Sequence, residues 1–257
     1  MYFDTHAHYD DRRFNDDRDD VLCSMEAAGV TRILNSSISL RSAKFCLYLA
    51  DRYPFVYASV GVHPHDVKDM TDGTVFELEE LLKHPKAVAV GEIGLDYHYD
   101  FSPRDVQKIR FREQMELARR AEKPVIIHMR EATQETLEIV GDFRDLTGVF
   151  HCFPGSWDTA KIILGMGWYL SFTGVITFSN ARKALEVIAK MPLDRLMLET
   201  DCPYMSPEPK RGRRNSSLNL PYIAEKVAQL RGITAEEVAA ITKENGLRLF
   251  NIQEPGD

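Results

Sequence analysis

Residues 87–97 read AVAVGEIGLDY, a nearly unbroken run of apolar residues that closes with polar ones. A strand that is buried on both faces has this composition, whereas a strand with one solvated face alternates apolar and polar residues. The run therefore predicts a parallel β-strand that is covered on both sides. Parallel strands joined by covering helices are typical of α/β proteins.

Seven further segments have the same character, and together they predict an eight-stranded barrel. The expected strands are 2–7, 31–36, 55–61, 87–93, 124–128, 147–152, 168–173 and 195–201. Each strand start follows the previous one at the spacing that a βα unit needs. The length of 257 residues fits one TIM (β/α)8 barrel, and no Pro/Gly/Ser-rich linker divides the chain. We therefore expect a single domain over residues 1–257.

Amphipathic segments between the strands predict the covering helices. Residues 40–53 and 102–122 carry apolar side chains at helical spacing. Ser102 and Pro103 have the composition of a helix cap and first turn, so we expect the second of these helices to begin there.

Two capping-box patterns mark further helix starts. Thr74 with Glu77, and Thr234 with Glu237, place a hydroxyl and a carboxylate three residues apart, as the box requires. The second box opens residues 234–250, which follow the eighth strand and predict an additional C-terminal helix.

The composition describes a soluble globular protein, with 44% hydrophobic and 28% charged residues. The formal net charge is −7, so a polyanion can be bound only through a local basic patch or bound cations. The four cysteines include no CxxC pair and no signal peptide precedes the first strand, which predicts reduced thiols and a cytoplasmic enzyme. No apolar run has the length of a transmembrane helix, so we expect no membrane partner.

Metal-binding side chains gather at the carboxyl ends of the predicted strands. In a (β/α)8 barrel these ends meet on one face, where the active sites of such enzymes lie. Six of the eight histidines fall there, together with one glutamate and one aspartate. They are His6, His8, His63, His65, Glu92, His128, His151 and Asp201.

Each of these residues also has a structural interpretation. Residues two apart on a strand point the same way, so His6 and His8 can bind one cation, although such a pair alone is equally consistent with packing. His128 and His151 could instead cap their strands through hydrogen bonds to carbonyls. Glu92 lies among apolar residues, which is unfavourable unless a partner such as a metal is present.

The joint placement at several strand ends favours a metal site over these alternatives. One carboxylate can bridge two cations, and an aspartate beside them can accept a proton from an attacking water. We therefore predict as metal ligands His6, His8, Glu92, His128, His151 and Asp201. The imidazoles suit Zn or Mn and the carboxylates also accept Mg, so the sequence leaves the ion open.

Seven motifs together resemble the TatD-type metal-dependent deoxyribonucleases over essentially the whole chain. The resemblance implies a TIM barrel, up to two divalent ions, a monomer, and DNA hydrolysis that is often 3′→5′ exonucleolytic. The motifs are FDTHAH (3–8), GVHPH (61–65), GEIGLDY (91–97), PVIIH (124–128), HCF (151–153), LETDCPY (198–204) and RGRRN (211–215).

Carried over by position, the resemblance divides the site residues into roles. It implies one metal on His6, His8, Glu92 and Asp201, and a second on Glu92, His128 and His151. Glu92 would then bridge the two ions, Asp201 would be the general base, and His63 and His65 would contact substrate. The chain departs from the family after RGRRN, where Ser216 and Ser217 stand in place of the common Glu-Pro.

The segment 203–218 is long, rich in Pro and Arg, and without periodicity. Its basic run 210–214 follows the last strand, so we predict that Arg211 contacts phosphate, although a solvated charge run is the plain alternative. Four aromatic residues near strand ends are candidates for stacking on bases or for packing at the rim: Tyr97, Tyr99, Phe153 and Tyr204. Cys152 and Cys202 follow proposed ligands and are expected to pack into the barrel–helix layer.

These features predict a divalent-metal-dependent hydrolase of phosphodiester bonds, with DNA or a smaller phosphodiester as substrate. An amide, lactone or phosphotriester hydrolase on the same barrel is the alternative. Such enzymes often bridge their metals with a modified lysine at the end of the fourth strand, where this chain has Glu92. A metal-binding protein without catalysis is the least favoured interpretation, because the ligand set includes a candidate base.

Overall fold

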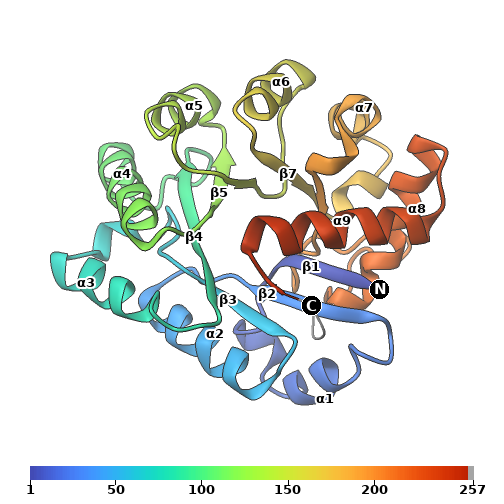
Figure 1. Ribbon diagram of the computed structural model, residues 1–257, viewed down its shortest axis with the longest axis horizontal. Helices are drawn as coiled ribbons and strands as arrows, with labels where there is room; N and C mark the ends of the chain where they lie inside the picture. The colour runs from blue at the N-terminus through green and yellow to red at the C-terminus, as the bar shows by residue number, and fades with distance from the viewer. Residues whose placement is uncertain (254–257) are drawn as a thin grey trace.

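The computed structural model describes residues 1–253 and confirms the TIM barrel. Eight parallel strands are hydrogen-bonded in chain order and form a ring with helices outside it (Figure 1). The sheet closes where Ala7 pairs with Cys202 and the His8 amide donates to the Cys202 carbonyl at 2.8 Å. The strands are β1 Tyr2–Ala7, β2 Val30–Asn35, β3 Val56–Val60, β4 Ala87–Asp96, β5 Val125–Arg130, β6 Gly148–Phe150, β7 Tyr169–Phe172 and β8 Leu196–Leu198.

Helices fill the connections between the strands. The α-helices are α1 Arg18–Cys23, α2 Leu40–Arg52, α3 Asp72–Leu81, α4 Arg104–Ala121, α5 Thr133–Gly141, α6 Trp157–Gly165, α7 Arg182–Lys190, α8 Leu220–Arg231 and α9 Ala235–Phe250. Short 3₁₀ turns are η1 Arg12–Phe14, η2 Val67–Asp69, η3 Gly174–Thr177, η4 Leu193–Arg195 and η5 Ser217–Asn219. No helix within residues 1–253 is long and apolar enough to cross a membrane. The expected domain end at 257 lies outside the described residues.

Strand ends differ from the prediction in a way that shapes the site. β4 is longer than 87–93, because pairing with β5 continues to Asp96 opposite Arg130. β6 and β8 are shorter than expected, since the backbone turns into the left-handed region at Cys152 (φ 40°) and Asp201 (φ 55°). His151 and Asp201 therefore stand just beyond their strands rather than within them.

Two predicted helix starts are wrong, and one is correct. The capping box of α3 pairs Thr71 with Thr74, each hydroxyl accepting from the other residue's backbone N–H, so the predicted Thr74–Glu77 box begins three residues late. At α4 the cap position is Pro103, because the Ser102 hydroxyl is used elsewhere, donating to the His65 carbonyl at 2.8 Å. The box at Thr234 opens α9 as predicted.

The C-terminal helix α9 lies across the amino-terminal end of the barrel (Figure 1). Leu247 and Phe250 pack against Phe3 of β1. The three residues belong to a core cluster that is separate from the main barrel–helix core and that includes buried residues of every strand but β3. Gly246 faces Phe3 so closely that a Cβ there would lie 2.6 Å from the ring. The amino end is thus filled by apolar side chains, and the carboxyl end is left for the polar residues.

Candidate metal centre

Glu92 lies at the middle of the polar cluster, buried in β4 with 3% of its surface exposed. Two glycines bring β4 close enough to β5 for this. A Cβ at Gly91 would lie 2.7 Å from the Ile126 Cβ, and a Cβ at Gly94, where φ is 143°, would lie 2.0 Å from the His128 carbonyl oxygen. The GEIG stretch therefore sets the carboxylate beside His128.

One oxygen of Glu92 faces the first group of side chains. Its Oε2 lies 3.2 Å from His6 Nε2 and 3.7 Å from His8 Nε2. The two imidazole nitrogens are themselves 3.1 Å apart. Asp201 completes the group, with Oδ1 at 3.3 Å from His8 Nε2 and 3.9 Å from His6 Nε2.

The other oxygen of Glu92 faces a second group. Its Oε1 lies 2.8 Å from both His128 Nδ1 and His151 Nε2, which are 3.2 Å from each other. His63 joins this group, with Nε2 3.4 Å from the same oxygen. His63, Glu92 and His128 thus form a group whose ligand atoms lie close enough together to hold a metal ion.

The second nitrogens of three imidazoles are held by neighbouring groups. His6 Nδ1 lies 3.1 Å from the Ser36 hydroxyl, and His8 Nδ1 lies 2.8 Å from the Ser36 carbonyl. His128 Nε2 lies 3.0 Å from Asp96 Oδ2. Such outer contacts fix the ring orientation and turn the remaining nitrogen inward, as is usual for metal-binding histidines.

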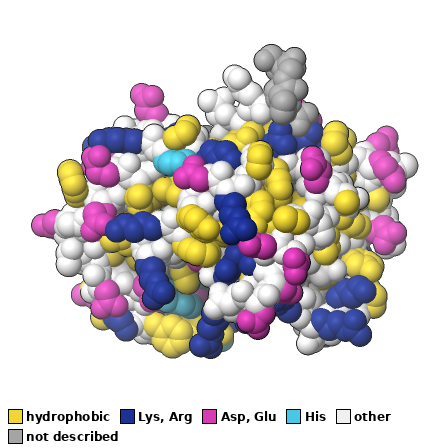
Figure 2. All heavy atoms as spheres, turned by 90° about the horizontal axis from the view of Figure 1, so that it is seen from below, with side chains coloured by type: hydrophobic (Ala, Val, Ile, Leu, Met, Phe, Trp, Pro, Cys, Tyr) yellow, Lys and Arg dark blue, Asp and Glu magenta, His cyan; other side chains and the backbone are white. Residues whose placement is uncertain are grey.

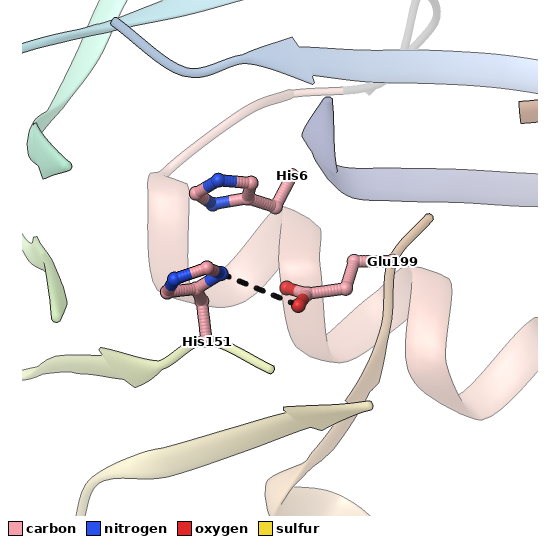
Figure 3. A group of neighbouring side chains, drawn as sticks. All are labelled: His6, His151 and Glu199. Atoms are coloured by element: carbon pink, nitrogen blue, oxygen red, sulfur yellow. Dashed lines mark ion pairs between the residues drawn. The ribbon is translucent and has the colours of Figure 1, made fainter. Parts of the chain in front are cut away.

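Glu199 faces the second nitrogen of His151 as an ion-pair partner, and the sequence analysis missed it. Its Oε1 lies 3.5 Å from His151 Nδ1, while the rings of His151 and His6 stack at 4.1 Å (Figure 3). Glu199 is fully buried and accepts hydrogen bonds from the Cys152 amide and the Ser171 hydroxyl. The signal was present, because a buried acid two residues before Asp201 is as unfavourable without a partner as Glu92.

The charges around the cluster favour bound cations. Burial acts to raise the pKa of Glu92, but the surrounding imidazoles outweigh it and hold that pKa well below the usual range. Burial likewise acts to raise the pKa of Asp201, but the hydrogen bond and charge of His8, together with the charges of His6 and His151, outweigh it and lower that pKa. Burial lowers the pKa of His8, but Asp201 and Glu92 raise it to about 9. The site therefore keeps its carboxylates ionised and attracts positive charge.

A cavity of about 260 Å³ opens onto the second group. Its wall includes His128, His151 and Asp201, and also Cys152 and Arg130. The prediction that Cys152 packs into the helix layer is wrong, because the left-handed turn at this residue breaks the strand alternation. Cys202 is fully buried, as expected.

Two predicted substrate-contact residues lie farther from Glu92. His65 Nε2 lies 3.0 Å from Asp96 Oδ2, so His65 and His128 share one carboxylate. Arg211 is 3.6 Å from Glu208, and its guanidinium lies 4.4 Å from the Phe178 ring centroid. Among the described residues these are its contacts, so a phosphate contact by Arg211 stays a prediction.

Comparison with known proteins follows this geometry. The family model described as "TatD related DNase" matches residues 3–251. The chain belongs to the TatD family of metal-dependent hydrolases.

TatD-family relatives match along their whole length. An uncharacterized metal-dependent hydrolase YabD of Bacillus subtilis is 42% identical, over 98% of this chain and 100% of the relative. A protein of Cronobacter sakazakii named 3′-5′ ssDNA/RNA exonuclease TatD is 36% identical, over 96% of this chain and 97% of the relative. The crystal structure of YjjV, a TatD homologue of Escherichia coli, superposes with a TM-score of 0.92 at 32% identity, covering 98% of both chains.

The TatD barrel is also shared by more distant enzymes. A phosphotriesterase homology protein of Escherichia coli superposes with a TM-score of 0.69 at 17% identity, covering 97% of this chain and 98% of that one. At this identity the likeness concerns the fold alone. The reaction therefore has to be argued from the side chains at the carboxyl end.

Proposed function

We propose that this chain is a two-metal phosphodiesterase that hydrolyses DNA, as a deoxyribonuclease of the 3′→5′ exonuclease type. The observation that carries the proposal is the division of Glu92, whose two oxygens face two separate groups of nitrogen ligands. A carboxylate in this arrangement suits a bridging role, and two-metal sites are common in phosphodiester hydrolysis.

The donor set fits two divalent ions. The first would be held by His6, His8, Glu92 and Asp201, and the second by Glu92, His128 and His151. The held outer nitrogens leave the inner ones free to bind, and imidazole with carboxylate suits Zn or Mn and accepts Mg. Such ions, when bound, supply Lewis-acid polarisation of phosphoryl oxygens and a water of lowered pKa.

The chain's own groups then orient substrate and move the proton. Asp201 lines the cavity and is ionised at neutral pH, since its pKa is lowered, so its carboxylate can accept the proton of the attacking water. Burial lowers the pKa of His63 to about 4, so this imidazole is neutral and can donate one hydrogen bond to a phosphate oxygen. Glu92 stays ionised, with one carboxylate oxygen facing each of the two groups of imidazoles.

DNA as the substrate class is supported by the relative from Cronobacter sakazakii, whose name states 3′-5′ exonuclease activity on single-stranded DNA and RNA. The amide or lactone alternative is disfavoured by Glu92, which occupies the place of the modified lysine expected in such barrels. A phosphodiester also carries the negative charge that a cation-rich site attracts.

A substrate panel tests the proposal. The protein is stripped of metal with a chelator, reloaded with Zn, Mn or Mg, and assayed on bis-(p-nitrophenyl) phosphate, end-labelled single-stranded DNA and an amide. We expect both phosphodiesters to be hydrolysed after reloading, with labelled nucleotides released from the 3′ end. Hydrolysis of the amide alone, or DNA cleavage that resists chelation, would overturn the proposal.

A further inference from the structure

Two exposed aromatic rings lie side by side just after β4. Tyr99 and Phe101 are 48% and 57% exposed, with ring centroids 5.1 Å apart and planes within 15° of parallel. Large apolar side chains exposed as a pair offer a flat surface for another ring. Phe101 was not among the sequence candidates, because nothing in its polar loop indicates that its ring stacks on Tyr99.

The pair is connected to the metal centre by one histidine. The His65 ring meets Tyr99 edge-on at 5.4 Å and Phe101 at 4.9 Å. The same imidazole reaches Asp96, which holds the proposed ligand His128. The two rings therefore lie at the edge of the polar cluster, in the segment that follows β4, and β4 is the neighbour of β5 in the barrel (Figure 1).

Arg130 lies between the rings and the cavity. Its guanidinium is 4.7 Å from the Tyr99 ring centroid, and the residue lines the cavity with His128 and Asp201. Within residues 1–253 its guanidinium forms no hydrogen bond or ion pair, whereas that of Arg104 is paired with Asp100 at 2.7 Å. An unpaired guanidinium beside a hydrolytic site is suited to phosphate oxygens.

The surface elsewhere offers less for a nucleic acid. On the face shown in Figure 2, Lys and Arg side chains are mixed with Asp and Glu rather than forming one basic surface. Among the other aromatic candidates, Tyr97 and Phe153 are buried, and Tyr204 is exposed but meets a neighbouring ring only edge-on, at His8. The Tyr99–Phe101 pair differs from these candidates in offering two exposed rings that lie nearly parallel.

We propose that Tyr99 and Phe101 form a stacking platform for an unpaired nucleobase, and that Arg130 binds the adjoining phosphate. The occupant is single-stranded nucleic acid, because duplex bases are stacked on each other and present no free face to a platform. The inference rests on the proposed function and names the part of the substrate that lies outside the metal centre. Aromatic stacking contributes about 1–3 kcal/mol per base, so the platform governs affinity rather than the chemical step.

Binding and cleavage of matched oligonucleotides test the platform. The double variant Tyr99→Ala/Phe101→Ala is compared with Tyr48→Ala/Phe76→Ala, which removes equally exposed rings from α2 and α3. Binding is measured by fluorescence anisotropy in chelator, where no cleavage occurs, and KM and kcat are measured after metal reloading. We expect Kd and KM for single-stranded DNA to rise about tenfold in the first variant only, with kcat little changed.

An abasic oligonucleotide separates stacking from phosphate binding. Wild-type protein should bind it about tenfold more weakly than normal DNA, and the platform variant should no longer distinguish the two. Arg130→Gln should weaken both oligonucleotides by the same factor, and Tyr99→Phe/Phe101→Tyr should restore wild-type affinity. Wild-type Kd and KM in the alanine platform variant would overturn the inference.

Failure of the proposed function has a different signature. Wild-type protein would then cleave neither phosphodiester after metal reloading. The Kd measured in chelator would still report on the platform, so the two failures are distinguishable.

Discussion

The two ends of the barrel are built from the same eight strands but filled in opposite ways. At the amino end, α9 packs Leu247 and Phe250 onto Phe3 in a buried apolar cluster. At the carboxyl end, imidazoles and carboxylates surround Glu92, with hardly any of this polar surface exposed. The first end is stabilised by burial of apolar area, whereas the second concentrates charge that a cation would balance. One end therefore serves stability and the other serves chemistry.

The comparison predicts the largest effect on catalysis at the carboxyl end. Glu92→Gln keeps the size of the side chain but removes the charge shared by both groups. We expect phosphodiester hydrolysis to fall by at least about 10²–10³-fold and bound metal to decrease, because the interaction acts on developing charge. The measurements are kcat and metal content by mass spectrometry.

The exposed carboxylate of Glu131 offers a matched control. Glu131→Gln should keep wild-type activity and metal content. Full activity in Glu92→Gln would show that this carboxylate is not shared between ions.

The amino end should show the reverse pattern. Phe250→Ala removes a ring that is 2% exposed, so we expect a loss of about 3–5 kcal/mol in the free energy of unfolding. The folded variant should keep metal content and kcat at low temperature, because the cluster lies at the far end of the barrel. Denaturant unfolding measures the stability, and an assay of the same sample measures kcat. A large loss of kcat in the folded variant would contradict the separation of roles between the two ends.

Within the carboxyl end, Glu199 distinguishes a residue that orients a ligand from a residue that binds metal directly. If its role is to hold His151, Glu199→Gln should weaken metal binding about 10–100-fold without abolishing it. A direct ligand role would instead lose one ion entirely. Competition titration against a metal chelator measures the affinity, with Glu186→Gln on the outer helix α7 as the control.

The smallest expected effect is the change in metal affinity with pH. In the metal-free protein, burial lowers the pKa of His8 but its carboxylate neighbours raise it to about 9, so this imidazole carries a proton at pH 7. A metal must displace that proton, and affinity should rise up to about tenfold per pH unit until pH 9. Calorimetry in buffers of different ionisation enthalpy measures the released protons, and pH-independent binding without release would contradict the assignment.

Much of this architecture could be predicted from local patterns. The apolar runs located all eight strands, because burial on both faces leaves a signal within a few consecutive residues. The helix starts at Thr71 and Pro103 were missed, since several hydroxyls near a helix start compete as caps and the choice depends on tertiary contacts.

The roles of individual polar residues were harder to predict. Arg211 was chosen because it lies in a conspicuous basic run, and its phosphate contact stays a prediction. Arg130, which lines the cavity, gave no comparable signal in the sequence. Cys152 was assigned by strand alternation, which its left-handed backbone interrupts. The error at Cys152 comes from applying a regular pattern where the chain turns.

The sequence by itself determined the barrel and the side chains that stand at its carboxyl end. Each strand, and its place in the order along the chain, can be recognised from a few consecutive residues. Only the tertiary structure decided which oxygen of Glu92 faces which imidazole, that Glu199 holds His151, and that Tyr99 and Phe101 meet in the open. Those facts depend on distances between elements far apart in the chain. Barrel closure fixes these distances, and no local pattern records them.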